Sequence, residues 1–250
     1  MSRSIQFFLT PAAGKRLIAA AVVKRADVQE ALQHGTIFVI GGTTNVFVAN
    51  ALLEALGSPL RAEFPSFHRG VAAPAGTEFI QAETQGDLLI EKGVPRFVNA
   101  LPEICATLKA GDIIFKGANA VHLESRTAGV LIGNTETGGT IAEASRAVMS
   151  RRAALIHPAG VEKRVEKPVY ELARLVNAAD ASGLRLHPSA GDIFTELDAI
   201  KLLFDADAEI ISAGAVNGGE GGTYFQAAGG DLDGLLACVR EIAKEPPVFC

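Results

Sequence analysis

Short apolar runs rich in β-forming residues alternate along this chain with longer stretches that have helical spacing. This alternation constrains the fold most, because strands that alternate with helices tend to build parallel sheets. The runs are continuously apolar, which is typical of strands covered on both faces. The sequence therefore predicts an α/β fold with a three-layer, doubly wound, mainly parallel sheet of Rossmann-like type. Predicted strands cover 36–40, 87–90, 112–115, 130–132, 153–156, 184–186 and 209–212, and predicted helices cover 46–56, 95–108, 141–152, 169–179, 193–204 and 232–243.

The whole chain, 1–250, is expected to form a single α/β domain, since a chain of this length can bury a full core without disulfides or metals. One stretch, 57–78, has three prolines and no clear period, and it is too long for an ordinary connection. We interpret it as a small lobe or a lid. The three cysteines form no CxxC pair and the five histidines have no metal-ligand spacing, so neither a metal nor a cofactor is expected.

Charge and hydropathy exclude several classes of partner. The formal net charge is -5 and no dense basic cluster is present, so nucleic acid is not an expected partner. No apolar run approaches the roughly 18 residues of a spanning helix, so no membrane association is expected. The amino terminus has no long apolar stretch followed by a cleavage site, which makes the cytoplasm the default location. A homo-oligomer is expected, because symmetric dimers are common among soluble proteins.

The loop after the first predicted strand has the composition of an anion site. Gly41 and Gly42 allow a ligand to approach the backbone closely. Thr43, Thr44 and Asn45 add polar groups, and the following helix directs free amides and its positive dipole end at the same point. A phosphate or a carboxylate is the expected occupant. The alternative is that the glycines only turn the chain and a threonine only caps the helix.

A second loop with polar side chains follows the predicted strand 112–115. Lys116 at the strand end can neutralise a ligand oxyanion, Gly117 leaves room beside the backbone, and Asn119 can orient a hydroxyl or carbonyl group. Glu124, further along, is a candidate general base. The alternative is a surface lysine followed by a turn-forming asparagine.

A third loop, after the predicted strand 130–132, repeats the strand, glycine turn and helix arrangement. Gly138 and Gly139 are candidate ligand-binding residues, and Glu136 is a carboxylate that can abstract a proton or attack an acyl group if it faces the site. Its alternative role is a favourable charge near a helix amino terminus. Dinucleotide, nucleoside triphosphate and zinc-hydrolase motifs are absent from the sequence, and no GxSxG elbow occurs.

These segments resemble a superfamily that comprises ribose-5-phosphate isomerase, glucosamine-6-phosphate deaminase, CoA transferases and the effector domains of DeoR-type sugar regulators. The resemblance covers roughly residues 15–160 and implies the α/β fold of that superfamily. It also implies that Gly42, Thr43 and Thr44 hold the phosphate of a ligand. The segments that carry it are Gly-Gly-Thr-Thr-Asn at 41–45, Lys-Gly-Ala-Asn-Ala-Val at 116–121, Glu-Ala-Ser-Arg-Ala at 143–147 and the strand that ends at His157.

The resemblance further implies that residues 116–119 line the sugar chain of the ligand. Asn119 stands where the isomerases carry an acidic residue, and the Gly-Ala-Asn form is more similar to the DeoR effector domain. Only about 35 residues precede the first predicted strand, which is too few for the winged DNA-binding module of such regulators.

The sequence therefore predicts a protein that binds a small anionic, phosphorylated metabolite and isomerises or otherwise transforms it. Two alternatives remain open: a non-catalytic metabolite-binding or sensor protein, and a CoA or acyl transferase-like enzyme that acts through Glu136. A carboxylate of Glu136 or Glu124 beside the bound anion would favour an enzyme, and neither facing the cleft would favour a binding protein.

Overall fold

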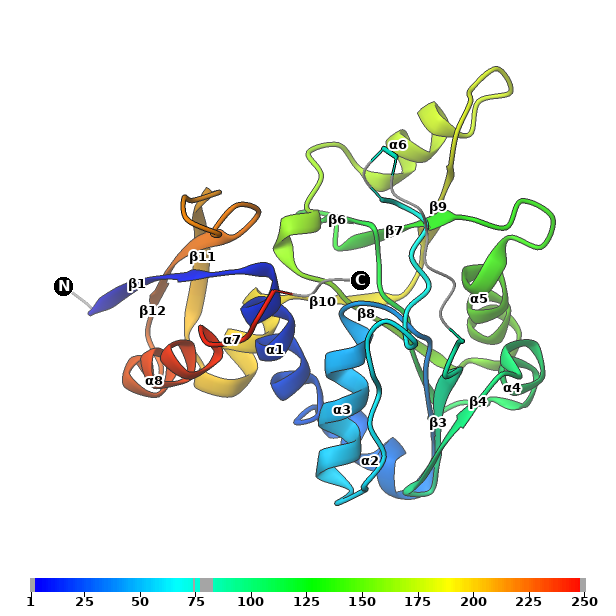
Figure 1. Cartoon of the computed structure of the whole chain (residues 1–250), viewed down its shortest axis with the longest axis horizontal. Helices are drawn as coiled ribbons and strands as arrows, with labels where there is room; N and C mark the ends of the chain where they lie inside the picture. The colour runs from blue at the N-terminus through cyan, green and yellow to red at the C-terminus, as the bar shows by residue number, and fades with distance from the viewer. Residues whose placement is uncertain (1–2, 74, 77–82, 248–250) are drawn as a thin grey trace.

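The computed structural model of this chain describes residues 3–73, 75–76 and 83–247. Figure 1 shows a larger body built around a central sheet, with a smaller lobe beside it that contains β1, β11, β12, α7 and α8. The strands are β1 (Ser4–Leu9), β2 (Thr36–Val39), β3 (Asp87–Glu91), β4 (Val94–Val98), β5 (Ile113–Phe115), β6 (Ala120–His122), β7 (Thr127–Ile132), β8 (Ala154–Pro158), β9 (Arg185–Ser189), β10 (Asp192–Phe194), β11 (Asp207–Ala213) and β12 (Thr223–Ala228). The helices are α1 (Pro11–Val22), α2 (Ala26–His34), α3 (Asn45–Ala55), α4 (Leu101–Thr107), α5 (Gly139–Arg151), α6 (Val169–Val176), α7 (Glu196–Phe204) and α8 (Leu232–Ile242), and the 3-10 turn η1 spans Val161–Lys163.

The central sheet has six strands in the order β10-β8-β5-β2-β3-β4. The first four strands are parallel, and β3 and β4 each pair antiparallel with their neighbour. Alternate residues of β2 enter two core clusters: Ile37 and Val39 pack with residues of α1 and α3, and Phe38 packs with residues of α4 and α5. Helices thus cover both faces of β2, which explains its uninterrupted apolar run. The predicted α/β fold with a mainly parallel sheet is confirmed for this sheet.

Two further sheets, each of three antiparallel strands, lie beside the central one. They have the orders β1-β12-β11 and β6-β7-β9. The prediction that 130–132, 184–186 and 209–212 join the parallel sheet is therefore wrong, because 130–132 lie in β7, 185–186 in β9 and 209–212 in β11. An apolar run indicates that a strand is buried, but it does not indicate which sheet the strand joins. Strand β7 is covered on both faces by other elements. A single three-layer, doubly wound arrangement is accordingly not confirmed for the chain as a whole.

Two predicted helices begin too early. Residues 95–98 of the predicted helix 95–108 belong to β4, which pairs with β3 through a hairpin at Lys92 and Gly93. Both hairpin residues have positive φ, 46° and 79°, as a two-residue turn of this kind requires. Pro95 is tolerated because β4 is an edge strand. The predicted helix 193–204 begins at Glu196, after β10.

Six elements were not predicted from the sequence: β1, α1, α2, β6, β10 and β12.

The segment 57–78 is described for residues 57–73 and 75–76, and it forms no helix or strand there. Phe67 is fully buried in the core and accepts a hydrogen bond from the Gly42 N–H at 3.1 Å. Arg69 forms an ion pair with Asp87 of β3. This part of the segment is therefore packed against the carboxyl end of β2. None of the helices in the described residues is long and apolar enough to cross a membrane.

Candidate functional site

The first two predicted loops meet at one pocket. Strands β2 and β5 are parallel neighbours, with Val39 opposite Phe115, so the loops after them emerge side by side. Together they line a cavity of about 80 Å³, which we call the strand-end pocket. That volume has room for a small anion or a few water molecules. The pocket is lined by Gly41, Gly42, Thr43, Thr44, Arg69, Gly70, Lys116, Gly117, Ala118, Asn119 and Lys163.

The two glycines of the first loop have their N–H groups already bonded. Gly41 donates to Asp87 Oδ1 at 2.8 Å, and Gly42 donates to the Phe67 carbonyl at 3.1 Å. The N–H groups of Thr43 and Thr44, just before α3, have no acceptor among the described residues. The Thr44 hydroxyl is likewise without a partner there, although its residue is only 2% exposed. The loop therefore presents unused donors at a helix amino terminus, where an anion is stabilised.

Asn45 supports the pocket without lining it. Its side-chain amide donates to the carbonyl groups of Ile40, at 2.7 Å, and Phe115, at 3.1 Å, and the residue is fully buried. It therefore ties the ends of β2 and β5 together at the first turn of α3. The sequence predicted a ligand contact for Asn45, and the structure shows this bracing contact.

Three cations reach the pocket from different parts of the chain. Arg69 donates to the buried carboxylate of Asp87 through two nitrogens, at 3.1 and 3.0 Å. Lys163, from η1, donates its Nζ proton to the Ala118 carbonyl at 2.8 Å, and burial lowers its pKa. Lys116 is buried at the end of β5. Burial, and then the charge of Lys163, lowers the pKa of Lys116 to about 8.

A histidine behind Lys116 joins three strands. His157 of β8 lies within 2.5 Å of the Lys116 carbonyl through Nδ1 and within 2.6 Å of the Ser189 hydroxyl through Nε2. Since the carbonyl only accepts, Nδ1 carries the proton and Nε2 accepts from Ser189. Burial lowers the pKa of His157 to about 4, so the ring is neutral at pH 7. This arrangement holds the end of β5 in place beside the pocket.

A group of buried charges adjoins Lys163 on the side of the smaller lobe. Glu196, the first residue of α7, accepts the Val161 N–H at 2.8 Å and is 3% exposed. The carboxylates of Glu196 and Glu162 both approach Gly160, where a Cβ would collide with each. Burial and then the charge of Glu162 raise the pKa of Glu196. The pair therefore carries less negative charge than two free carboxylates would.

The third predicted loop lies elsewhere. Glu136 is exposed, and its N–H donates to Oδ1 of Asn134 at 3.0 Å, so this N–H is not free to bind a ligand. Gly138 and Gly139 have positive φ, 76° and 65°, and turn the chain into α5. These residues follow β7, which belongs to an antiparallel sheet, and the structure does not place them at the strand-end pocket.

Glu124 is also separate from the strand-end pocket. It is exposed and lines a different depression, of about 390 Å³, with residues that include His122, Arg164 and Glu166. Asn119 does line the strand-end pocket, while its Oδ1 accepts the Leu131 N–H at 3.0 Å.

Three residues of the pocket were missed by the sequence reading: Arg69, Gly70 and Lys163. Arg69 and Gly70 lie in the irregular segment 57–78, whose basic residues were a weak signal. Lys163 follows β8, the next parallel strand, so a search for basic residues after every predicted strand would have found it. No local pattern shows that these residues converge.

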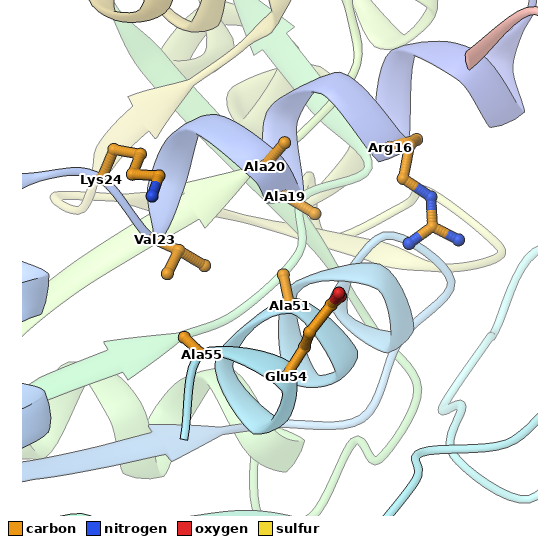
Figure 2. A pocket seen from close by; sticks show the side chains of 8 residues that line it. All are labelled: Arg16, Ala19, Ala20, Val23, Lys24, Ala51, Glu54 and Ala55. Atoms are coloured by element: carbon orange, nitrogen blue, oxygen red, sulfur yellow. The ribbon is translucent and has the colours of Figure 1, made fainter. Parts of the chain in front are cut away.

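Another depression, shown in Figure 2, lies between α1 and α3 and has a volume of about 340 Å³. Four of its eight lining residues are alanines. Arg16 at one end is paired with Glu245 at 2.8 Å and stacks over the Phe47 ring. It is larger than the strand-end pocket, but its arginine charge is already matched, so it is less suited to an anion.

Comparisons of this chain with protein-family models, with curated proteins and with solved structures found no match. The class that fold and site define is a mixed α/β protein with a small cationic pocket at the carboxyl end of its parallel strands. The resemblance to the isomerase and CoA transferase superfamily stays a hypothesis.

Proposed function

We propose that this protein binds a small anionic, phosphorylated metabolite in the strand-end pocket, with the anionic group against the Thr43 and Thr44 N–H groups. The membership of the sugar-phosphate isomerase and CoA transferase superfamily, with its doubly wound architecture, is part of the same proposal. The pocket lies where parallel α/β sheets commonly hold ligands, outside the carboxyl ends of the strands.

The observation that carries this proposal is the charge balance of the pocket. Three cations, Arg69, Lys116 and Lys163, line the pocket, and no carboxylate is among its lining residues in the described part of the chain. Asp87 pairs with Arg69, and the carboxylates of Glu162 and Glu196 act on Lys163 from outside the pocket. In the described part of the chain, neither lysine forms an ion pair. Keeping unpaired charges in a buried place costs folding free energy, unless a ligand of opposite charge offsets it. A phosphate monoester, with a charge of about -1.5 to -2 at pH 7, supplies such an opposite charge.

The position of the carboxylates bears on the choice between enzyme and binding protein. Glu124 and Glu136, the two predicted catalytic residues, do not line the strand-end pocket. A general base must come within hydrogen-bonding reach of the proton it removes. This favours, as a second candidate function, a non-catalytic metabolite-binding or sensor protein over an isomerase or an acyl transferase that relies on these two side chains.

Titration calorimetry with inorganic phosphate tests the proposal. The wild-type protein is expected to bind phosphate, and Lys163→Met is expected to weaken binding by about 5- to 150-fold, the loss for one charge-assisted hydrogen bond. Lys244→Met is the matched control, since Lys244 is an exposed lysine paired with Glu241. Absence of phosphate binding to the wild type at millimolar concentrations, or equal weakening in both variants, would overturn the proposal.

A further inference from the structure

Lys116 differs from the two other cations of the strand-end pocket in how its charged end is held. Arg69 is fixed by Asp87 through two hydrogen bonds, and Lys163 donates to a backbone carbonyl. The Nζ atom of Lys116 has no hydrogen-bond or ion-pair partner in the described ranges. Its backbone, by contrast, is held in the ladder between β5 and β8. The amine end of the side chain is therefore free to reach a ligand, while the backbone of Lys116 is held in place.

The groups around Lys116 favour its neutral form. Lys163 from η1 and Arg69 repel its charge, Asp87 of β3 attracts it, and the His157 ring behind it is neutral. Burial is the largest effect, and the pKa of Lys116 is lowered to about 8. At pH 7 the Lys116 amine is then unprotonated in about a tenth of the protein molecules, whereas the fraction for an ordinary surface lysine is well under a hundredth. Desolvation beside a second cation is a known way to activate a lysine nucleophile.

We propose that Lys116 is a nucleophile that forms an imine with a ligand carrying both an anionic group and an aldehyde or ketone. This inference rests on the proposed function, because the anion held by the Thr43 and Thr44 N–H groups positions the carbonyl. The pocket places the free amine of Lys116 and these donors in one cavity of about 80 Å³. A carbonyl group only a few bonds from the anion would therefore lie beside Nζ.

The reaction needs no oxidant or reductant. The Nζ lone pair attacks the carbonyl carbon and the carbonyl π electrons move to oxygen, which takes up the proton that nitrogen loses. The resulting hydroxyl takes a second proton from solvent and leaves as water, while the nitrogen lone pair forms the C=N bond. Amine, carbonyl compound and one proton thus give a protonated imine and one water. The positive charge is retained at Lys116, next to the bound anion.

Borohydride trapping tests this step. The whole protein is incubated with glycolaldehyde phosphate and sodium borohydride, which reduces an imine to a stable secondary amine, and peptide mass mapping locates the adduct. We expect the main adduct on Lys116. At neutral pH it should form at least tenfold faster than any adduct on Lys244, and its rate of formation should be half-maximal near pH 8. Lys116→Arg should lose this adduct yet still bind inorganic phosphate, since arginine keeps the charge but forms no such imine. Lys244→Arg is the matched control and should keep it.

The outcomes separate this inference from the proposed function. Phosphate binding without a Lys116 adduct overturns the imine and leaves the binding function standing. An adduct that forms equally fast with glycolaldehyde, which lacks the phosphate, overturns the anion-directed placement. Competitive acetylation with acetic anhydride gives a measurement that needs no variant: a titration midpoint near 8 for Lys116 supports the nucleophile, and one near 10.5 overturns it.

Discussion

At the scale of single residues, the strand-end pocket depends on Gly42, because the space that a side chain would occupy at this position is open. A Cβ on Gly42 would have as its nearest neighbour the Cβ of Asn45, at 3.9 Å, and the φ of Gly42 is not positive. The backbone at Gly42 therefore does not require glycine for its own conformation. The open space beside it belongs to the pocket.

Gly42→Val should abolish phosphate binding while leaving the fold intact, because its branched side chain would fill much of a cavity of about 80 Å³. Calorimetry should show at least a tenfold loss of affinity, with a smaller loss for Gly42→Ala. The thermal unfolding midpoints of both variants should stay close to the wild-type value. Unchanged phosphate affinity in Gly42→Val would rule out the placement of the anion.

The buried charge of Lys116 is expected to destabilise the protein when no ligand is bound. The pKa of Lys116 is about 8 in the folded protein, against an ordinary 10.5. Between these pH values the unfolded chain binds more protons, so stability rises with pH across this window. Below pH 8, where Lys116 is charged in both the folded and the unfolded protein, burial of this charge lowers the free energy of unfolding by on the order of 3 kcal/mol.

Lys116→Met should therefore raise the free energy of unfolding at pH 7 by about 1 to 3 kcal/mol, and the gain should shrink by pH 10. The same variant should bind phosphate more weakly, by about 1 to 3 kcal/mol. Urea unfolding at the two pH values and calorimetry measure the two effects. A variant that is less stable than the wild type at pH 7 would contradict the first.

At the scale of elements, helix α1 packs against the start of α7 at a glycine. A Cβ on Gly14 would overlap Oε1 of Glu196. Alanine in a helix is ordinarily more stabilising than glycine by about 1 kcal/mol. The close approach of α1 and α7 should reverse this preference.

Gly14→Ala is accordingly expected to destabilise the protein by about 1 to 3 kcal/mol, the usual cost of overpacking. In a Glu196→Ala background the obstruction is gone, and the same substitution should become stabilising. A double-mutant cycle from urea unfolding measures this change of sign. Equal effects of Gly14→Ala in both backgrounds would show that the carboxylate is not the obstacle.

The strands β5, β8 and β9 are joined through the neutral ring of His157. Its pKa is about 4 in the folded protein, against an ordinary 6.5. Between these values the unfolded chain binds more protons, so stability is lost as the pH falls from 6.5 to 4. The loss should be on the order of 3 kcal/mol in the wild type and clearly smaller in His157→Gln, which does not titrate. Urea midpoints measured across this range provide the comparison, and parallel curves would exclude His157 as the source.

At the scale of the whole molecule, the smaller lobe and the central body share one core. A single cluster of buried residues contains Phe7 of β1 and Phe225 of β12 together with Leu17 of α1 and Val48 of α3. Strand β1, at the start of the chain, pairs with β12 near its end. The lobe therefore depends on both ends of the chain and on the body.

Urea unfolding should consequently show one cooperative transition. The chain has no tryptophan and two tyrosines, so Tyr170→Phe leaves Tyr224 of β12 as the only tyrosine, and tyrosine fluorescence then reports on the lobe. The fluorescence midpoint of this variant should coincide with the far-UV circular dichroism midpoint. A lobe that unfolds at lower urea concentration than the body would contradict the shared core.

The parts of the fold and site that could be predicted from sequence are the local ones. The apolar run before Gly41 and the polar turn after it mark a strand end and a helix start, since burial and capping act over a few neighbouring residues. The same holds for the strand that ends before Lys116. Two such turns after parallel strands lie at the same sheet edge, which is why the pocket formed by Gly42, Thr44 and Lys116 could be anticipated.

The remaining features depend on which strands pair, and that depends on contacts between residues far apart in the chain. An apolar run such as 130–132 fits any strand covered on both faces, so its pattern did not reveal that β7 joins an antiparallel sheet and carries Glu136 away from the pocket. Arg69 and Lys163 reach the pocket through an irregular segment and a short turn without periodicity. Local patterns thus specified the strand ends, and the packing of the sheets selected the side chains that meet there. The physical reason is that burial acts on each strand separately, whereas bringing these side chains into one pocket requires that all the strands pair correctly.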